Sequence, residues 1–205
     1  MEIQKIEDAL KILRSGKKKK FIQTLDLIIN LQNFDVRKES VNTFVKVPNT
    51  SGKKICGFLT KKTKIVDSIV KEEFDMFKNP REIKRLADKY DFFIAAAPLM
   101  SAVATKFGRV LGPVGKMPSP QAGIITSESD ESIQAMVDKM NSLVRVRTKE
   151  SSIKFPIGKE DLSDKELKEN IEAAVSSLEA ILPRKNDNIK NVLIKFTMTK
   201  PERIR

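Results

Sequence analysis

Ile55-Cys-Gly-Phe-Leu-Thr60 is an apolar run without alternation, and it decides the fold of the middle of the chain. Such a run is typical of a strand that is buried on both faces of a parallel sheet. The segments after it predict helix and strand in alternation. We expect helices over 64–71, 80–89, 98–106 and 129–143, and a strand over 92–96. Residues 55–147 are therefore predicted to form a small α/β domain with a parallel core.

The two flanking parts of the chain have a different pattern. Before the middle block, the sequence predicts a helix over 2–15 and strands over 21–30 and 41–47. After it, the sequence predicts a strand over 152–158, a helix from Ser163 to about Leu182 and a strand over 191–198. Ser163 is the expected N-cap of this helix, with Glu166 as its capping-box partner.

One discontinuous domain accounts for both flanks. Two strands and one helix on each side of the middle block would together make a single α+β domain. We therefore predict a discontinuous α+β domain from residues 1–54 and 148–205, with the α/β domain of residues 55–147 inserted into it.

The charge balance favours a polyanionic partner. The 205 residues contain 39 Lys and Arg against 27 Asp and Glu, a net charge of +12. Lys and Arg exceed Asp and Glu by six over residues 1–54, by four over 55–147 and by two over 148–205. The run Lys17–Lys20 is either a solvated loop or part of a polyanion contact. A basic protein with no nucleic-acid role has the same balance, so charge alone does not decide.

Composition excludes several classes of protein. Eleven Phe, one Tyr and no Trp give few stacking platforms, which favours a reader of structured RNA over a binder of single strands. No His is present, so the usual general base and zinc ligand are missing. Cys56 is the single cysteine and is predicted to be a small strand residue in a reducing compartment. No apolar run is long enough for a membrane span, and the N-terminus does not resemble a signal peptide.

The segment Gly108–Pro120 contains three Gly, three Pro and two cations, which predicts a rigid, exposed, basic loop. Its Gly115-Lys116 pair is similar to the end of a phosphate-binding P-loop. The comparison fails because Val110 stands in place of the first glycine and Met117 in place of the Ser or Thr. A structural or docking loop is the preferred interpretation of this segment.

A signature and four further motifs in the right order resemble the L-one family of large-subunit ribosomal proteins. Leu111-Gly-Pro-Val-Gly-Lys-Met-Pro-Ser-Pro120 is similar to the family signature, and Lys20–Asp26 to its first strand. Val47–Lys53 resembles the first hinge between domains and Lys154–Lys159 the return hinge, while Phe196-Thr-Met-Thr resembles the closing motif. The ending Lys-Pro-Glu-Arg-Ile-Arg is similar to the archaeal and eukaryotic branch.

The resemblance implies a split β-α-β RNA-binding domain with an antiparallel sheet, and an inserted Rossmann-like domain. It implies a non-enzymatic, cytoplasmic protein of the large ribosomal subunit that binds the rRNA of the mobile stalk beside the tRNA exit site. Exit-site tRNA and the protein's own mRNA are implied partners. The protein would be a monomer outside the ribosome, with no cofactor, metal or membrane.

The resemblance also implies site residues. The RNA-binding positions are Lys20, Phe21, Thr24, Asp26, Lys154, Gly158, Lys159, Thr197, Met198 and Thr199. The signature loop comprises Gly108, Arg109, Leu111, Gly112, Pro113, Gly115, Lys116, Met117, Pro118 and Pro120. Lysines would neutralise phosphates, and a threonine hydroxyl would suit a 2′-OH. Asp26 would accept from a 2′-OH or a base amine.

Three positions depart from the family pattern. Thr199 stands where the family usually has Gly, Val114 where it has Arg, and Asn49-Thr50 where it has His-Gly. Two other functions stay open on the residues alone. One is an α/β enzyme that binds a nucleotide or phosphorylated substrate through the Gly-Pro loop, and the other is a free RNA-binding regulator.

Overall fold

The computed structural model describes residues 3–16, 19–36, 39, 41–50, 52–77, 79–120, 122–148 and 150–205. Lys17 and Lys18 of the basic run lie outside the described residues. The chain divides into two compact units. Unit 1 comprises Met1–Ser51 and Ser142–Arg205, and unit 2 comprises Gly52–Asn141. These bounds differ from the predicted 54/55 and 147/148 chiefly because the strand Leu143–Arg147 pairs within unit 1.

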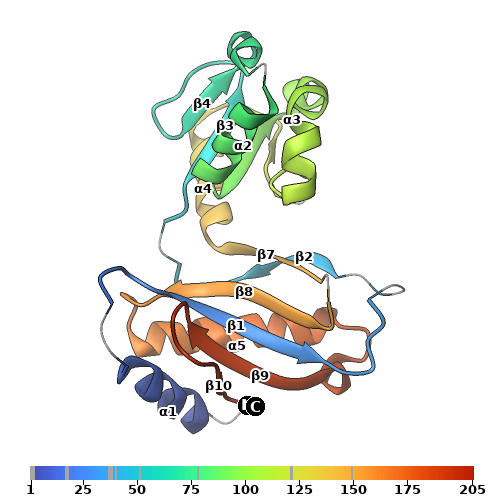
Figure 1. Ribbon diagram of the computed structural model, residues 1–205. Helices are drawn as coiled ribbons and strands as arrows, with labels where there is room; N and C mark the ends of the chain where they lie inside the picture. The colour runs from blue at the N-terminus through green and yellow to red at the C-terminus, as the bar shows by residue number, and fades with distance from the viewer. Residues whose placement is uncertain are drawn as a thin grey trace. The chain divides into compact units, whose positions relative to one another are not determined.

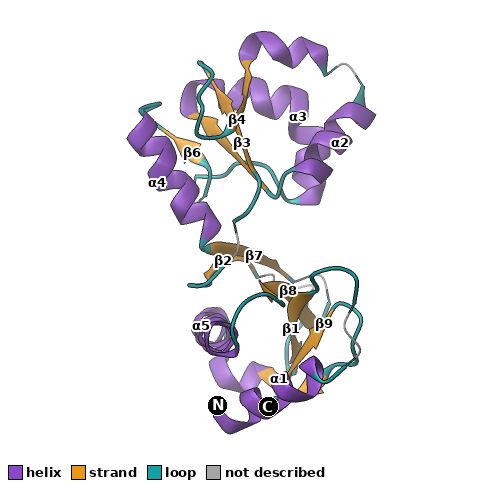
Figure 2. Ribbon diagram, turned by 90° about the vertical axis from the view of Figure 1, so that its left-hand side faces the viewer, coloured by secondary structure: helices purple, strands orange, loops and turns teal. Residues whose placement is uncertain are grey.

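Unit 1 is built on a four-stranded antiparallel sheet (Figure 1). Its strand order is β10 (Glu202–Arg203), β9 (Ile189–Phe196), β1 (Thr24–Leu31) and β8 (Ser152–Lys159). Helices α1 (Ile3–Arg14) and α5 (Asp164–Ile181) cover the same face of the sheet (Figure 2). Burial alternates along β1, so Leu25, Leu27 and Ile29 point into this core. The alternate residues of β1 face away from the helices.

A two-stranded ribbon completes unit 1. β2 (Asn42–Lys46) pairs antiparallel with β7 (Leu143–Arg147), and Val45, Val144 and Val146 join the same core. The chain leaving this ribbon is anchored to α5 by the buried side chain of Asn170. Asn49 N donates to Asn170 Oδ1 (2.8 Å), and Asn170 Nδ2 donates to Asn49 O (2.5 Å) and to Ile157 O (2.9 Å). These bonds use the backbone of Asn49, and its side chain adds a further contact, because Asn49 Nδ2 donates to Glu169 Oε2 at 2.9 Å.

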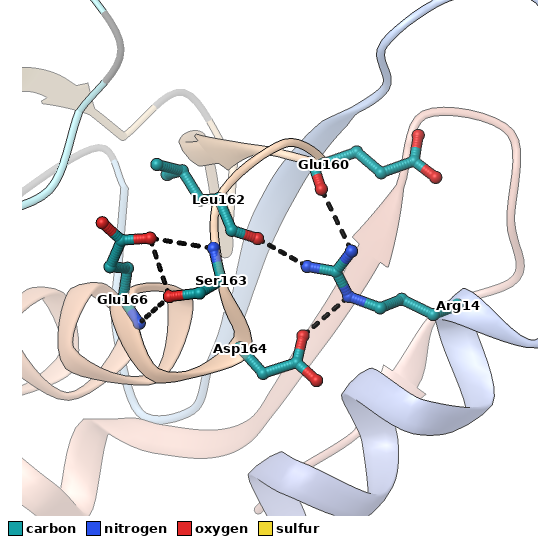
Figure 3. Close-up of polar contacts among 6 residues, drawn as sticks. All are labelled: Arg14, Glu160, Leu162, Ser163, Asp164 and Glu166. Carbon is teal, nitrogen blue, oxygen red and sulfur yellow. Dashed lines mark hydrogen bonds and ion pairs between the residues drawn. The ribbon is translucent and has the colours of Figure 1, made fainter.

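The predicted start of α5 is confirmed (Figure 3). Ser163 is the N-cap, and its Oγ accepts from Glu166 N at 3.3 Å. Glu166 Oε2 in turn accepts from Ser163 N at 2.8 Å, which completes the capping box. The Ser163 hydroxyl also donates to Glu166 Oε2 at 2.7 Å, and this bond, together with the one from Ser163 N, lowers the pKa of Glu166.

Unit 2 contains a parallel sheet of order β4 (Asp67–Val70), β3 (Ile55–Leu59), β5 (Phe92–Ala96) and β6 (Ile124–Ile125). Helices α2 (Pro80–Lys89) and α3 (Met100–Val114) lie on one side of it and α4 (Asp130–Asn141) on the other (Figure 2). All five residues of β3 are buried, as the apolar run predicts. Short 3₁₀ helices span Lys71–Met76 and Ala97–Leu99 here, and Lys185–Asn188 in unit 1.

Aromatic packing fixes the α2–α3 side of unit 2. The Phe58 ring lies 4.9 Å from that of Phe107, 5.6 Å from Phe93 and 5.7 Å from Phe74, measured between centroids. The helix predicted over 64–71 is wrong, because this segment contains strand β4 and the start of a 3₁₀ helix. Ile69 of β4 and Phe74 of the 3₁₀ helix both pack into this core, so burial overrides the polar composition.

The prediction that Gly108–Pro120 forms an exposed loop is wrong for its first half. Helix α3 continues to Val114, because Val103, Phe107 and Leu111 recur every four residues and are buried. Gly108, Gly112 and Pro113 are therefore helical. Gly115 ends the helix with φ of 80°, a left-handed conformation that favours glycine.

Lys116 also has a structural role that the loop interpretation misses. Its Nζ donates to Ala87 O at 2.7 Å and to Tyr90 O at 2.8 Å, the last carbonyls of α2. A cation at this end satisfies carbonyls that the helix leaves open and complements the helix dipole. The signature lysine therefore fastens the end of α3 to the end of α2.

We expect Lys116→Met to lower the free energy of unfolding of unit 2 by about 1–3 kcal/mol, because two carbonyls lose a charged donor. Urea denaturation followed by tyrosine fluorescence measures this, since Tyr90 is the only tyrosine and the chain has no Trp. Arg109→Met is the control, because Arg109 is exposed on the preceding helix, α3. Equal stability of the two variants would contradict the structural role of Lys116.

Candidate nucleic-acid interface

The face of the unit 1 sheet that points away from α1 and α5 is the candidate interface. On β1 it carries Thr24, Asp26, Ile28 and Asn30, which are all partly accessible. Asn30 Nδ2 donates to Asn191 Oδ1 on β9 at 2.7 Å. Because the opposite face is covered by two helices, this face is the one through which the sheet can meet a partner.

Cations from three strands gather around this face. Lys154 lies opposite Ile28 and Lys159 opposite Thr24, both on β8. On the other side of β1, Lys195 of β9 lies opposite Asp26. Arg203 of β10 lies opposite Leu193 of β9. Sequence reasoning missed Lys195 and Arg203, although the alternation of β9 around its buried Val192 and Ile194 indicates that Lys195 faces the open side.

Three turns meet at one end of this sheet, and two of them expose large apolar side chains. Phe21 and Ile22 precede β1 and are 51% and 62% exposed, and Met198 follows β9 and is 62% exposed. Lys20 is exposed next to Phe21 in the sequence, and Lys159, which pairs with Thr24, is exposed at the same end of the sheet. Exposed apolar groups that are flanked by cations suit bases and sugars next to phosphates.

The hydroxyls of Thr197 and Thr199 both hold backbone at this end. Thr197 Oγ1 accepts from Thr24 N at 3.2 Å, which ties β9 to β1. Thr199 Oγ1 accepts from Phe196 N at 2.9 Å and so closes the turn after β9. Thr199 is not among the described residues with positive φ, so its backbone does not need the glycine that the family usually has.

Gly158 has a packing reason to be glycine. It lies opposite Leu25, whose side chain is in the core, and not on the open face. A Cβ at this position would come within 2.6 Å of Leu167 Cδ2 on α5 and 3.0 Å of Leu162 Cδ1. The missing side chain therefore lets α5 and its preceding turn approach β8.

Asp26 is the one described residue of the predicted site whose pKa is shifted from its ordinary value. Burial in the sheet face raises the pKa of its carboxyl above the ordinary 3.8, and the Lys195 cation opposite it offsets part of the rise. A partly buried carboxylate among cations is ready to accept hydrogen bonds from a donor such as a 2′-OH.

Sequence reasoning missed Gln23 altogether. It was predicted to be an ordinary strand residue, but its side chain is 4% exposed and contacts two turns. No pattern in the sequence distinguishes it, because the partners are far away in the chain.

Other kinds of site are not supported by the described residues. No group of three or more His, Cys, Asp or Glu within them is arranged to hold a metal ion. Cys56 is buried, and burial raises the pKa of its thiol to about 12, so it is not a nucleophile. None of the described helices is both long and apolar enough to cross a membrane.

Comparison with known proteins gives one consistent family. The model of the ribosomal protein L1p/L10e family matches residues 13–200. Large ribosomal subunit protein uL1 of Nanoarchaeum equitans is 35% identical over 202 residues, which cover 93% of this chain and 95% of that protein. The uL1 protein of Thermococcus kodakarensis is 36% identical over 209 residues, covering 95% and 94%. That of Pyrococcus horikoshii is 33% identical over 214 residues, covering 95% and 93%. The chain therefore belongs to the ribosomal protein L1p/L10e family.

Proposed function

We propose that this chain is a structural constituent of the large ribosomal subunit and binds rRNA through the open face and loop end of the unit 1 sheet. The observation that carries the proposal is the gathering of Lys154, Lys159, Lys195 and Arg203 around one uncovered sheet face. Exposed Phe21, Ile22 and Met198 adjoin it. Family membership supports the ribosomal role.

The RNA is the bent helical element of the mobile stalk beside the tRNA exit site, as the family resemblance implies. Cations would position the phosphates, and Thr24 and Asp26 would meet sugar hydroxyls or base edges. Exit-site tRNA is a further partner, contacted in the ribosome by exposed groups of unit 2 such as Arg109. Repression of the protein's own mRNA would use the same unit 1 surface.

Two features of unit 2 count against the enzyme alternative. Gly112–Gly115 lies at the C-terminal end of α3, where the helix dipole is negative and repels phosphate. The carboxyl end of β3, the usual ligand position in a parallel sheet, is occupied by the Glu128 carboxylate. That carboxylate accepts from Thr60 N at 2.9 Å and from the Thr60 hydroxyl. A free RNA-binding regulator, the other alternative, is tested by co-sedimentation with large subunits.

Removing one cation of the interface should change the salt dependence of binding. We expect Lys159→Met and Lys195→Met each to make the slope of log K against log salt shallower by about one, since each removes one phosphate contact. Fluorescence titration of a stalk rRNA fragment at several salt concentrations measures the slopes. Lys84→Met is the control, because Lys84 is exposed on α2 of unit 2. A slope change for Lys84→Met as large as for Lys195→Met would contradict the assignment.

Asp26→Asn should stabilise the free protein at neutral pH. The pKa of Asp26 in the folded protein is raised above 3.8, its ordinary value. The ionised carboxylate therefore destabilises the fold at pH values above this raised pKa. The advantage of the variant is therefore absent well below pH 3.8, grows as the pH rises through the raised pKa and is then constant. Thermal unfolding from pH 3 to 7 measures it.

The same variant tests the binding role of Asp26. Loss of a negative charge alone would strengthen binding to RNA. Affinity that stays equal or falls indicates that the carboxylate accepts a hydrogen bond from the RNA. A clear rise in affinity for Asp26→Asn would count against its place in the interface.

A further inference from the structure

We propose that Gln23, Glu160 and Arg14 are positioning residues that set the loop end of the unit 1 sheet before RNA binds. The inference rests on the proposed rRNA-binding function. It assigns to these three residues the arrangement of the three turns at this end of the sheet. The turns are Lys20–Gln23 before β1, Glu160–Ser163 after β8 and Thr197–Thr199 after β9.

Gln23 joins all three turns through its backbone and side chain. Its Oε1 accepts from Met198 N at 3.2 Å, which holds the turn after β9. Its N and Nε2 donate to Glu160 Oε2 at 3.2 and 3.3 Å, and its O accepts from Glu160 N at 2.8 Å. The oxygen and the nitrogen of the side-chain amide are therefore both hydrogen-bonded, and the side chain is buried. Gln23 itself cannot reach RNA, whereas its neighbour Ile22 and its partner Met198 are exposed.

Arg14 holds the turn after β8 from the other side (Figure 3). Its guanidinium donates through Nη1 to Glu160 O at 3.1 Å and through Nη2 to Leu162 O at 2.6 Å. Its Nε donates to Asp164 Oδ1 at 2.6 Å. Three donors of one planar group thus fix the backbone and the start of α5 together, a geometry that lysine cannot reproduce.

The contacts form one connected path. It runs from the last turn of α1 through Arg14 to the backbone of Glu160, through the Glu160 carboxylate to Gln23, and from Gln23 to Met198. Each link joins segments that are far apart in the sequence. A surface whose turns are fixed beforehand avoids the ordering cost that binding otherwise includes. Loss of one link should therefore weaken RNA binding without removing any RNA contact.

The test compares Gln23→Leu with Gln32→Leu in the full chain. Gln32 follows the other end of β1 and its Nε2 donates to Asp187 O at 3.1 Å, so the same substitution removes an exposed side-chain hydrogen bond between segments far from the loop end. The probe is a stalk rRNA fragment. We expect Gln23→Leu to weaken binding about tenfold, with an unchanged salt slope, and Gln32→Leu to bind as the original chain does.

Two further measurements separate positioning from general stability. Hydrogen exchange of the free protein should be faster at Met198 N in Gln23→Leu, while Leu27 N in the middle of β1 keeps its protection.

Arg14→Lys keeps the positive charge, and it tests the same path of contacts if Gln23→Leu does not fold. It should weaken binding severalfold with the salt slope unchanged. The loss of affinity in both variants should appear as a slower association rate, because fewer molecules have the turns arranged for binding.

The outcomes are distinct. Weaker binding for folded Gln23→Leu or Arg14→Lys, with normal binding for Gln32→Leu, supports the inference. Normal binding by both loop-end variants, or equal losses for Gln32→Leu, overturns it and leaves the proposed function intact. Failure of the original chain to bind the stalk fragment overturns the proposed function and this inference with it.

Discussion

The alternation of buried and accessible side chains along β1 is the constraint on which unit 1 depends. Leu25, Leu27 and Ile29 must all face α1 and α5, so Thr24 and Asp26 must face the opposite side. A shift of one residue in register would bury the polar set and expose the apolar set. The neighbouring strands follow the same alternation, since their buried residues join the same core. The one-sided hydrophobic core therefore determines on which face of the sheet Lys154, Lys159 and Lys195 lie.

Unit 2 shows how a family signature can hold a fold together. Its last helical turn, the left-handed Gly115 and the Lys116 ammonium link α3 to α2. Cationic and glycine-rich segments suggest a ligand site when they are read in isolation. Here the lysine bonds to main-chain carbonyls, and only Arg109 and the exposed side chains nearby can meet an outside partner. The two units therefore differ in kind: unit 1 has an uncovered face, and the signature of unit 2 mainly maintains its packing.

The sequence predicts helices and strands well where hydrophobic periodicity and helix capping depend on neighbouring residues alone. The buried β3 run, the alternation of β1 and the Ser163–Glu166 box are found as expected. It fails where tertiary burial overrides local preference. Glycine and proline in 108–114 suggest a break, but the spacing of Phe107 and Leu111 keeps the segment helical. Lys195 follows from strand alternation, whereas Gln23 and Arg14 do not, because their partners lie more than half the chain away. The individual RNA contacts stay predictions.

The strand order of unit 1 also governs how the protein is made. β1 emerges early from the ribosome, yet both of its sheet neighbours, β8 and β9, come from the last third of the chain. Unit 2 is continuous, so it can fold while its surroundings are unfinished. The strand Thr24–Leu31 must wait, with unpaired N–H and C=O groups along both edges and one apolar face open to other chains. Synthesis of this protein thus includes an interval in which one strand needs protection from aggregation, and the interval ends only when β9 has been translated.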